Sequence, residues 1–184
     1  MTHRPDEREI EKIVREVLAE TESIPPRGRI AIGADHGGVD LKSSLARYLV
    51  EDLGYAVKDV GTHTKDAVDY PDTAAAVARA VQSSECFRGV VIDAAGIGSA
   101  IACNKFRGVR AATCHDVASV RNSREHNDAN VLSLGARFVN PGLARTLVRT
   151  FLATDFAGGR HARRVQKISA IEESEGISAP RDGR

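Results

Sequence analysis

A carboxylate, Asp93, stands between an apolar run and a loop of small residues. Residues 90–92 are typical of a buried strand, and the chain continues Ala94-Ala95-Gly96-Ile97-Gly98-Ser99. Small side chains let backbone N–H groups converge on an anion, and the N-terminus of a following helix adds partial positive charge. A carboxylate beside such a loop suits removal of a proton next to a carbonyl. The alternative is a tight strand-to-helix turn with an aspartate cap.

A second acidic site follows the first predicted strand, residues 29–34. Asp35 and His36 come directly after it, and two glycines follow them. Ligands of open α/β sheets collect beyond the carboxyl ends of the strands, so an Asp-His pair at this point could transfer protons. The alternative is a helix cap beside a surface histidine. The glycines do not form the G-x-G-x-x-G dinucleotide fingerprint.

Two further segments have the composition for acid–base chemistry and anion binding. Residues 124–130 are dense in polar side chains, and His126 among them has an ordinary pKa near neutrality. Arg160 and Arg164 lie four residues apart, which places both on one helix face suited to a phosphate monoester. Arg137 is a third candidate for the same group. The alternatives are a polar turn and a solvated basic face.

The elements that must position these residues alternate regularly along the chain. Apolar runs predict strands at residues 29–34, 55–60, 88–92, 109–114 and 130–134. Helical spacing predicts helices at residues 39–53, 72–81, 117–125, 141–152 and 159–172, with a short helix ending near residue 104. This order predicts an α/β, Rossmann-like three-layer sandwich with a five-stranded parallel sheet, spanning residues 29–173.

A separate amphipathic helix is predicted ahead of this domain, within residues 1–20. Its apolar residues recur with a period near 3.6: Ile10, Ile13, Val14, Val17 and Leu18. Residues 21–28 contain two prolines and a glycine, which predicts a linker. Residues 174–184 are expected to form a flexible tail.

Composition narrows the class of protein. The 184 residues are 42% hydrophobic with a formal net charge of +1, so no overall field favours nucleic acid. No apolar run is long enough for a membrane span. Three cysteines without metal-ligand spacing predict free thiols in a reducing, cytoplasmic setting and no metal site.

Together, these segments resemble the ribose-5-phosphate isomerase B family, whose relatives include the subunits of galactose-6-phosphate isomerase. The resemblance covers about residues 29–172 and depends on several motifs. They are Gly33-Ala34-Asp35-His36-Gly37-Gly38, Asp69-Tyr70-Pro71, Gly96-Ile97-Gly98 with Ala102-Cys103-Asn104-Lys105, Gly108-Val109-Arg110-Ala111-Ala112, residues 123–132 (SREHNDANVL) and Gly158-Gly159-Arg160-His161.

The resemblance implies interconversion of ribose 5-phosphate and ribulose 5-phosphate through an enediolate, without a metal or organic cofactor. It also implies a homodimer or tetramer with active sites shared between subunits. The alternatives are an isomerase for another phosphorylated sugar and a non-catalytic sugar-phosphate-binding partner subunit.

The resemblance also implies roles for individual residues. Asp35 and His126 would assist ring opening, His36 would line the sugar site, and Asn127 would hold sugar hydroxyls or the enediolate. His126 and Asn127 would face the Asp93 loop of a partner subunit. Backbone amides would stabilise the enediolate, from Ala95, Gly96, Gly98 and Ser99. The phosphate would be held by Arg137, Arg160 and Arg164.

The chain departs from the family pattern at the catalytic base. Many members have Cys-Gly-Thr-Gly where this chain has Asp93-Ala94-Ala95-Gly96, and others use a glutamate at the position of Ser99. Cys103 lies at neither position and is expected to pack as a small apolar residue. Because a carboxylate can remove a proton alpha to a carbonyl, we expect Asp93 to be the base.

Residues 8–20 lie outside the family core and resemble the short helices that target enzymes into bacterial microcompartments. This resemblance implies a shell protein as partner and a location inside such a compartment. The alternative is a helix that packs on its own domain.

Overall fold

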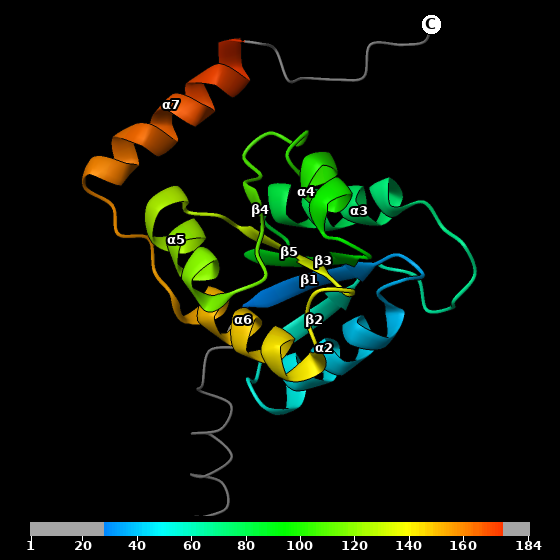
Figure 1. Ribbon diagram of the computed structural model, residues 1–184. Helices are drawn as coiled ribbons and strands as arrows, with labels where there is room; N and C mark the ends of the chain where they lie inside the picture. The colour runs from blue at the N-terminus through cyan, green and yellow to red at the C-terminus, as the bar shows by residue number, and fades with distance from the viewer. Residues whose placement is uncertain (1–27, 175–184) are drawn as a thin grey trace, which may run out of the picture.

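The computed structural model describes residues 28–174, so the helix predicted at 1–20, the linker up to residue 27 and the tail from residue 175 lie outside the described residues. Strands and helices alternate along the described chain (Figure 1). In order they are β1 (Arg29–Ala34), α2 (Val39–Glu51), β2 (Ala56–Asp59), α3 (Tyr70–Gln82), β3 (Arg88–Asp93), α4 (Ile97–Cys103), β4 (Ala111–Thr113), α5 (Val117–Asn127), β5 (Val131–Gly135), α6 (Pro141–Ala153) and α7 (Arg160–Ser174).

The five strands form one parallel sheet in the order β2-β1-β3-β5-β4. β3 is central, and Ile32 pairs with Val90 on one side of it while Leu132 pairs with Val90 on the other. The predicted five-stranded parallel α/β fold is therefore confirmed. The order reverses direction after β1, because the chain passes from β2 back across β1 to β3. In parallel sheets such a reversal opens a crevice at the carboxyl ends of the strands.

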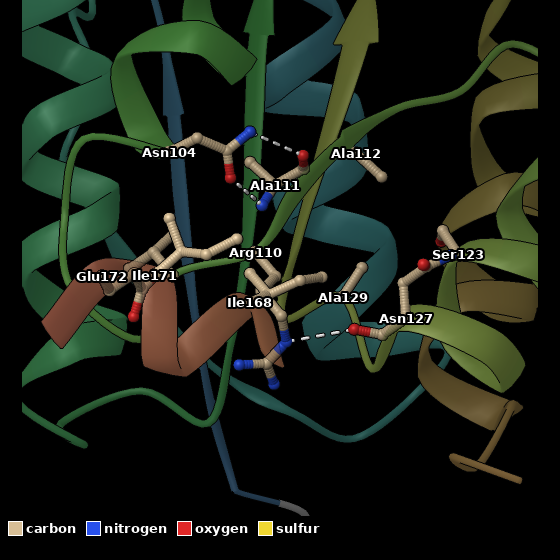
Figure 2. A pocket seen from close by; sticks show the side chains of 11 residues that line it. Asn104, Arg110, Ala111, Ala112, Ser123, Asn127, Ala129, Ile168, Ile171 and Glu172 are labelled. Atoms are coloured by element: carbon tan, nitrogen blue, oxygen red, sulfur yellow. Dashed lines mark hydrogen bonds between the residues drawn. The ribbon is translucent and has the colours of Figure 1, made fainter. Parts of the chain in front are cut away.

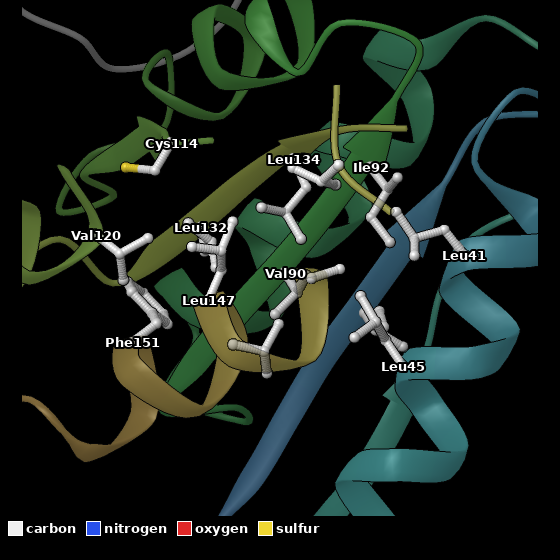
Figure 3. Packing of buried hydrophobic residues seen from close by; sticks show 14 of the residues in the cluster. Leu41, Leu45, Val90, Ile92, Cys114, Val120, Leu132, Leu134, Leu147 and Phe151 are labelled. Carbon is white, nitrogen blue, oxygen red and sulfur yellow. The ribbon is translucent and has the colours of Figure 1, made fainter. Parts of the chain in front are cut away.

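Helices cover both faces of the sheet and bury two apolar layers. On one face, α2, α5 and α6 enclose a core in which Leu45, Leu147 and Phe151 are fully buried against Val90 and Leu132 of the strands (Figure 3). On the other face, α3 and α4 pack through smaller residues such as Val77 and Ala78. Aliphatic side chains fill both layers, as expected for a chain with 4% aromatic residues.

Helix ends follow local signals in the sequence. Asn140 accepts a hydrogen bond from the Leu143 N–H at the start of α6, and Pro141 occupies the first turn, where proline is favoured. Asp116 caps α5 in the same way through the Ser119 N–H. No helix within residues 28–174 has the length and apolar character required to cross a membrane.

Most boundaries differ from the sequence-based expectation by one or two residues, and the differences at β4, α3 and α5 bear on the candidate site. β4 has only three residues, and α3 begins two residues early, at Tyr70. α5 continues through Asn127 rather than ending at Glu125, so His126 and Asn127 lie in its last helical turn and not in a loop. α7 extends away from the sheet, and among the helices of the described chain it packs against α5 (Figure 1).

Candidate functional site

Asp93 is the last residue of β3, and its buried carboxylate is enclosed by the loop that follows. One oxygen accepts hydrogen bonds from the backbone N–H groups of Ala95 (2.7 Å) and Gly96. The other accepts from the Ser99 N–H (3.0 Å) and the Ser99 hydroxyl (2.5 Å). A carboxylate offers about four lone-pair positions, so this one is fully occupied within its own loop.

The turn around Asp93 depends on Gly96, which adopts a left-handed conformation with φ of 78°. A Cβ there would lie 2.9 Å from the Gly135 nitrogen of the neighbouring strand. Only glycine fits both conditions, and the resulting turn directs the N–H groups of the loop toward Asp93.

These contacts keep Asp93 ionised. Burial acts to raise the pKa of Asp93, but the hydrogen bonds from the Ser99 hydroxyl and from the backbone of Gly96, Ser99 and Ala95 outweigh burial and lower the pKa below its ordinary value. The site therefore presents a charged carboxylate at neutral pH.

The predicted backbone donors divide into two groups. The N–H groups of Ala95, Gly96 and Ser99 already donate to Asp93. Those of Ile97 and Gly98, in the first turn of α4, donate to no other residue of the described chain. A bound oxyanion would therefore find its open donors at Ile97 and Gly98.

Asp35 lies close to Asp93 because β1 and β3 are hydrogen-bonded neighbours. One carboxylate oxygen of Asp35 accepts from the N–H groups of Gly37 (2.9 Å) and Gly38 (3.2 Å), and no described residue donates to the other oxygen. Both residues line a cavity of about 250 Å³, whose lining residues are Asp35, Tyr70, Asp93, Ala94, Ala95 and Gly98.

His36 is exposed at the same edge of the sheet. Its Nδ1 accepts a hydrogen bond from the Val68 N–H at 3.3 Å, which places the ring proton of neutral His36 on Nε2. His36 can therefore present a donor to a ligand.

Tyr70 belongs to the cavity although we did not predict it as a site residue. Its ring lies so close to Gly98 that a Cβ on Gly98 would approach it to 2.6 Å. The Asp69-Tyr70-Pro71 motif was the signal in the sequence, since it places an aromatic residue at the start of α3.

Cys103 does not take part in this site. It is fully buried against α3 with its thiol donating to the Ala74 carbonyl, and burial raises its pKa to about 12. It packs as a small apolar residue, as expected.

His126 and Asn127 form a second group with α7. The Asn122 amide donates to His126 Nδ1 at 2.8 Å, and the His126 ring stacks on His161 with centroids 4.1 Å apart. Arg160 and Arg164 flank His161 in the first turns of α7 and are exposed. Burial lowers the pKa of His161, and the nearby His126, Arg160 and Arg164 lower it further.

Partly buried ion pairs fix the end of α5 that carries these residues. Asp128 adopts a left-handed conformation with φ of 45° and accepts from Arg124 (2.7 Å) and Arg110 (2.8 Å). Arg110 Nε also donates to the carbonyls of Asn127 and Asp128, both at 3.0 Å. The main chain beside His126 is therefore held by Arg110, directly before β4, as well as by α5 itself.

The predicted site residues do not all meet within one chain. Arg137 is exposed in the loop after β5, where its N–H donates to the Ala94 carbonyl at 3.1 Å, close to Asp93. His126, Asn127, Arg160 and Arg164 do not line the Asp93 cavity. Figure 1 shows α5 and α7 on the opposite side of the molecule from the carboxyl end of β1.

A further hollow of the described chain lies beside the second group. It is a groove of about 410 Å³ between α7 and the short edge strand β4 (Figure 2). Ile168 and Ile171 of α7 face Ala111 and Ala112 of β4 across it, and Asn127 lies at its end. An apolar groove with exposed isoleucines is typical of a surface that another chain covers.

Comparison with known proteins identifies relatives over nearly the whole domain. The family model described as "Ribose/Galactose Isomerase" matches residues 30–168. Ribose-5-phosphate isomerase B of Escherichia coli is 44% identical over 145 residues, which cover 79% of this chain and 97% of that protein.

Two further relatives extend the comparison to structure and to another substrate. The structure of Clostridium thermocellum ribose-5-phosphate isomerase B superposes with a TM-score of 0.78 at 52% identity, covering 80% of this chain and 99% of that one. D-erythrulose-4-phosphate isomerase of Pectobacterium atrosepticum is 40% identical over 147 residues, covering 79% of this chain and 96% of that protein.

Proposed function

Because this chain belongs to the ribose/galactose isomerase family, we propose that it interconverts ribose 5-phosphate and ribulose 5-phosphate. The observation that carries this proposal is the cavity in which Asp35 and Asp93 lie together beside the first turn of α4. The reaction moves a proton between C1 and C2 through an enediolate, and it requires a base and donors for the developing negative charge.

In this reaction Asp93 acts as the base. It lines the cavity, it is ionised, and it stands where many relatives have a cysteine. The Ser99 hydroxyl is the one donor to Asp93 that can rotate, and its rotation would free a lone pair on the carboxylate to accept the carbon-bound proton. The open N–H groups of Ile97 and Gly98 then face the enediolate oxygens.

The remaining residues bind and open the sugar. Asp35 and His126 transfer the protons of ring opening, His36 and Asn127 hold hydroxyl groups, and Arg137, Arg160 and Arg164 bind the phosphate. Forked guanidinium donors suit a phosphate monoester.

A complete site requires two copies of the chain, in a homodimer or a tetramer. The separation of the Asp93 cavity from the group around His126 supports this assembly, and so does the apolar groove beside α7. One copy then supplies Asp35 and Asp93, and the other supplies His126, Asn127, Arg160 and Arg164.

Turnover by the purified full chain tests the function directly. We expect conversion of ribose 5-phosphate in a coupled assay and weaker conversion of galactose 6-phosphate. Erythrose 4-phosphate belongs in the same panel, because the similarity to D-erythrulose-4-phosphate isomerase makes another phosphorylated sugar the second candidate substrate. Binding of ribose 5-phosphate without turnover would instead support a non-catalytic partner subunit.

Residues 1–20 act in recruitment to a bacterial microcompartment, with a shell protein as the partner. Support comes from their five apolar residues at helical spacing and from the proline-containing linker that follows. Deleting residues 1–24 should leave kcat and KM unchanged and abolish co-localisation of a fused reporter with compartment shells. Loss of activity or folding on deletion would assign these residues to the catalytic assembly.

A further inference from the structure

His161 is a buried polar residue that the proposed reaction does not use. It is 8% exposed, whereas its neighbours Arg160 and Arg164 are exposed. Its ring lies parallel to that of His126, with centroids 4.1 Å apart and planes inclined by 5°. It is the one buried residue of α7 within the described chain, so it anchors the first turn of this helix to α5.

Hydrogen bonds specify the proton positions of both neutral rings. Arg160 Nε donates to His161 Nε2 at 3.4 Å, which leaves the His161 proton on Nδ1. The Asn122 amide donates to His126 Nδ1, which leaves the His126 proton on Nε2. The ring that opens the sugar is therefore oriented on one edge by Asn122 and on one face by His161.

The charges around His161 favour its neutral form. His126 and Glu125 approach it from α5, and Arg160 and Arg164 belong to its own helix. Three of these four groups are cations or become cations on protonation, and burial adds to their effect. A neutral aromatic ring can then support His126 in both of its protonation states, because a cationic ring is attracted to an aromatic face.

We propose that His161 is a positioning residue that orients His126 and links it to the phosphate-binding residue Arg160. This inference depends on the proposed function, since it deepens the roles given there to His126 and Arg160. The chain of contacts runs from Arg160 through His161 to His126. Binding of the non-reacting phosphate would thereby help to hold the ring that donates the proton.

Two substitutions separate the stacking contact from the hydrogen bond. His161→Phe keeps an aromatic ring beside His126 and removes the acceptor for Arg160, whereas His161→Ala removes both. We expect His161→Ala to lower kcat for ribose 5-phosphate by about 10- to 100-fold with a smaller change in KM, and His161→Phe to recover most of kcat. Equal losses in the two variants would overturn the stacking role.

A double-mutant cycle tests whether His161 acts through His126. In the His126→Ala background, His161→Ala should cause no further loss of kcat, because the group that it orients is absent. Losses that multiply would show a separate structural role and would overturn the proposal. If His161→Ala does not fold, His161→Phe and His161→Asn complete the same cycle.

Nuclear magnetic resonance of the histidine nitrogens provides a measurement that does not depend on turnover. In the full chain His126 should show the Nε2-protonated tautomer, and His161→Ala should change its tautomer ratio and titration. An unchanged His126 signal would overturn the inference. A changed signal in a protein that does not convert ribose 5-phosphate would retain the positioning role and reject the proposed function.

Discussion

Asp93 and Asp35 line one cavity but differ in hydrogen bonding. Both carboxylate oxygens of Asp93 accept hydrogen bonds, whereas only one oxygen of Asp35 does. We expect Asp93→Asn to lower kcat by about 10²- to 10⁴-fold, because the amide keeps the shape and cannot accept the carbon-bound proton. Steady-state kinetics on ribose 5-phosphate measure the effect, and Asp72→Asn on the exposed first turn of α3 is the matched control. Retention of near-full kcat would show that Asp93 is not the base and would favour Asp35, whose second oxygen accepts no hydrogen bond from the described chain.

Ser99 provides a test of the same carboxylate through pH. Its hydroxyl donates to the charged form of Asp93, so Ser99→Ala should raise the pKa of Asp93. A base must be ionised to work, and the acidic limb of kcat/KM should therefore move to higher pH in this variant. A pH profile identical to that of the unmodified chain would show that Asp93 does not control this limb.

The sequence could place Asp35 and Asp93 at the same edge of the sheet, because each follows a predicted parallel strand. That their two strands are neighbours is a finding of the structure, and so is the hydrogen bonding of Asp93. The Asp93 carboxylate has all of its acceptor positions occupied because the loop makes a left-handed turn at Gly96. At this turn the backbone comes close to Gly135 of β5. That contact joins segments about 40 residues apart and leaves no local pattern.

The end of α5 also depends on a contact that the local sequence does not predict, and here the contact changes the length of a helix. Polar residues 124–130 indicated a loop, yet the helix continues because Asp128 caps it and pairs with Arg124 of α5 and with Arg110, which directly precedes β4. Aspartate is one of the few residues other than glycine that tolerate the left-handed conformation. The long-range partner, Arg110, was the information that the local pattern lacked.

Removing the cap of α5 should destabilise the domain. Arg124 is 2% exposed, and Asp128→Ala leaves its charge buried with only carbonyl acceptors, so we expect a loss of about 2–3 kcal/mol in the free energy of unfolding. Asp128→Asn should lose less, because asparagine keeps an acceptor and the backbone conformation. Urea denaturation measures both, with the exposed Asp155→Ala as control.

The first turns of α7 provide a second prediction at this scale. Arg160→Ala and Arg164→Ala should each raise KM for ribose 5-phosphate, with a smaller fall in kcat, because each removes a phosphate donor. Arg163→Ala is the matched control, since Arg163 is exposed on the same helix and is not expected to bind phosphate. An unchanged KM in both variants would show that the substrate phosphate does not bind to this helix.

At the scale of the whole molecule, the two halves of the predicted site lie in different places on one chain. Sequence order predicted the sheet and the helices on both of its faces, because each depends on short segments. The pattern of apolar residues carried no signal for the distance between α7 and the Asp93 cavity, and only the family resemblance implied that the two halves come from different subunits. In the structure α7 extends away from the sheet of its own chain.

Mixing two inactive variants tests whether two copies share a site. Asp93→Asn and His126→Ala should each be nearly inactive alone. After unfolding and refolding together in equal amounts, they should recover about a quarter of the activity of the unmodified chain, because half of the dimers would be mixed and each would contain one intact site. A mixture that stays inactive would show that each chain contributes all residues of its own site.

The enclosure of Asp93 by its own loop also bears on inhibitor selectivity. Three N–H groups that could bind an anion are already neutralised by this carboxylate, and a second negative charge in the cavity would be repelled by it. Anionic mimics of the enediolate should therefore bind this chain less tightly than neutral polyol mimics of the same sugar phosphate. An anion-binding loop without an internal carboxylate would create the opposite preference, so a compound selected against such an enzyme should spare this one.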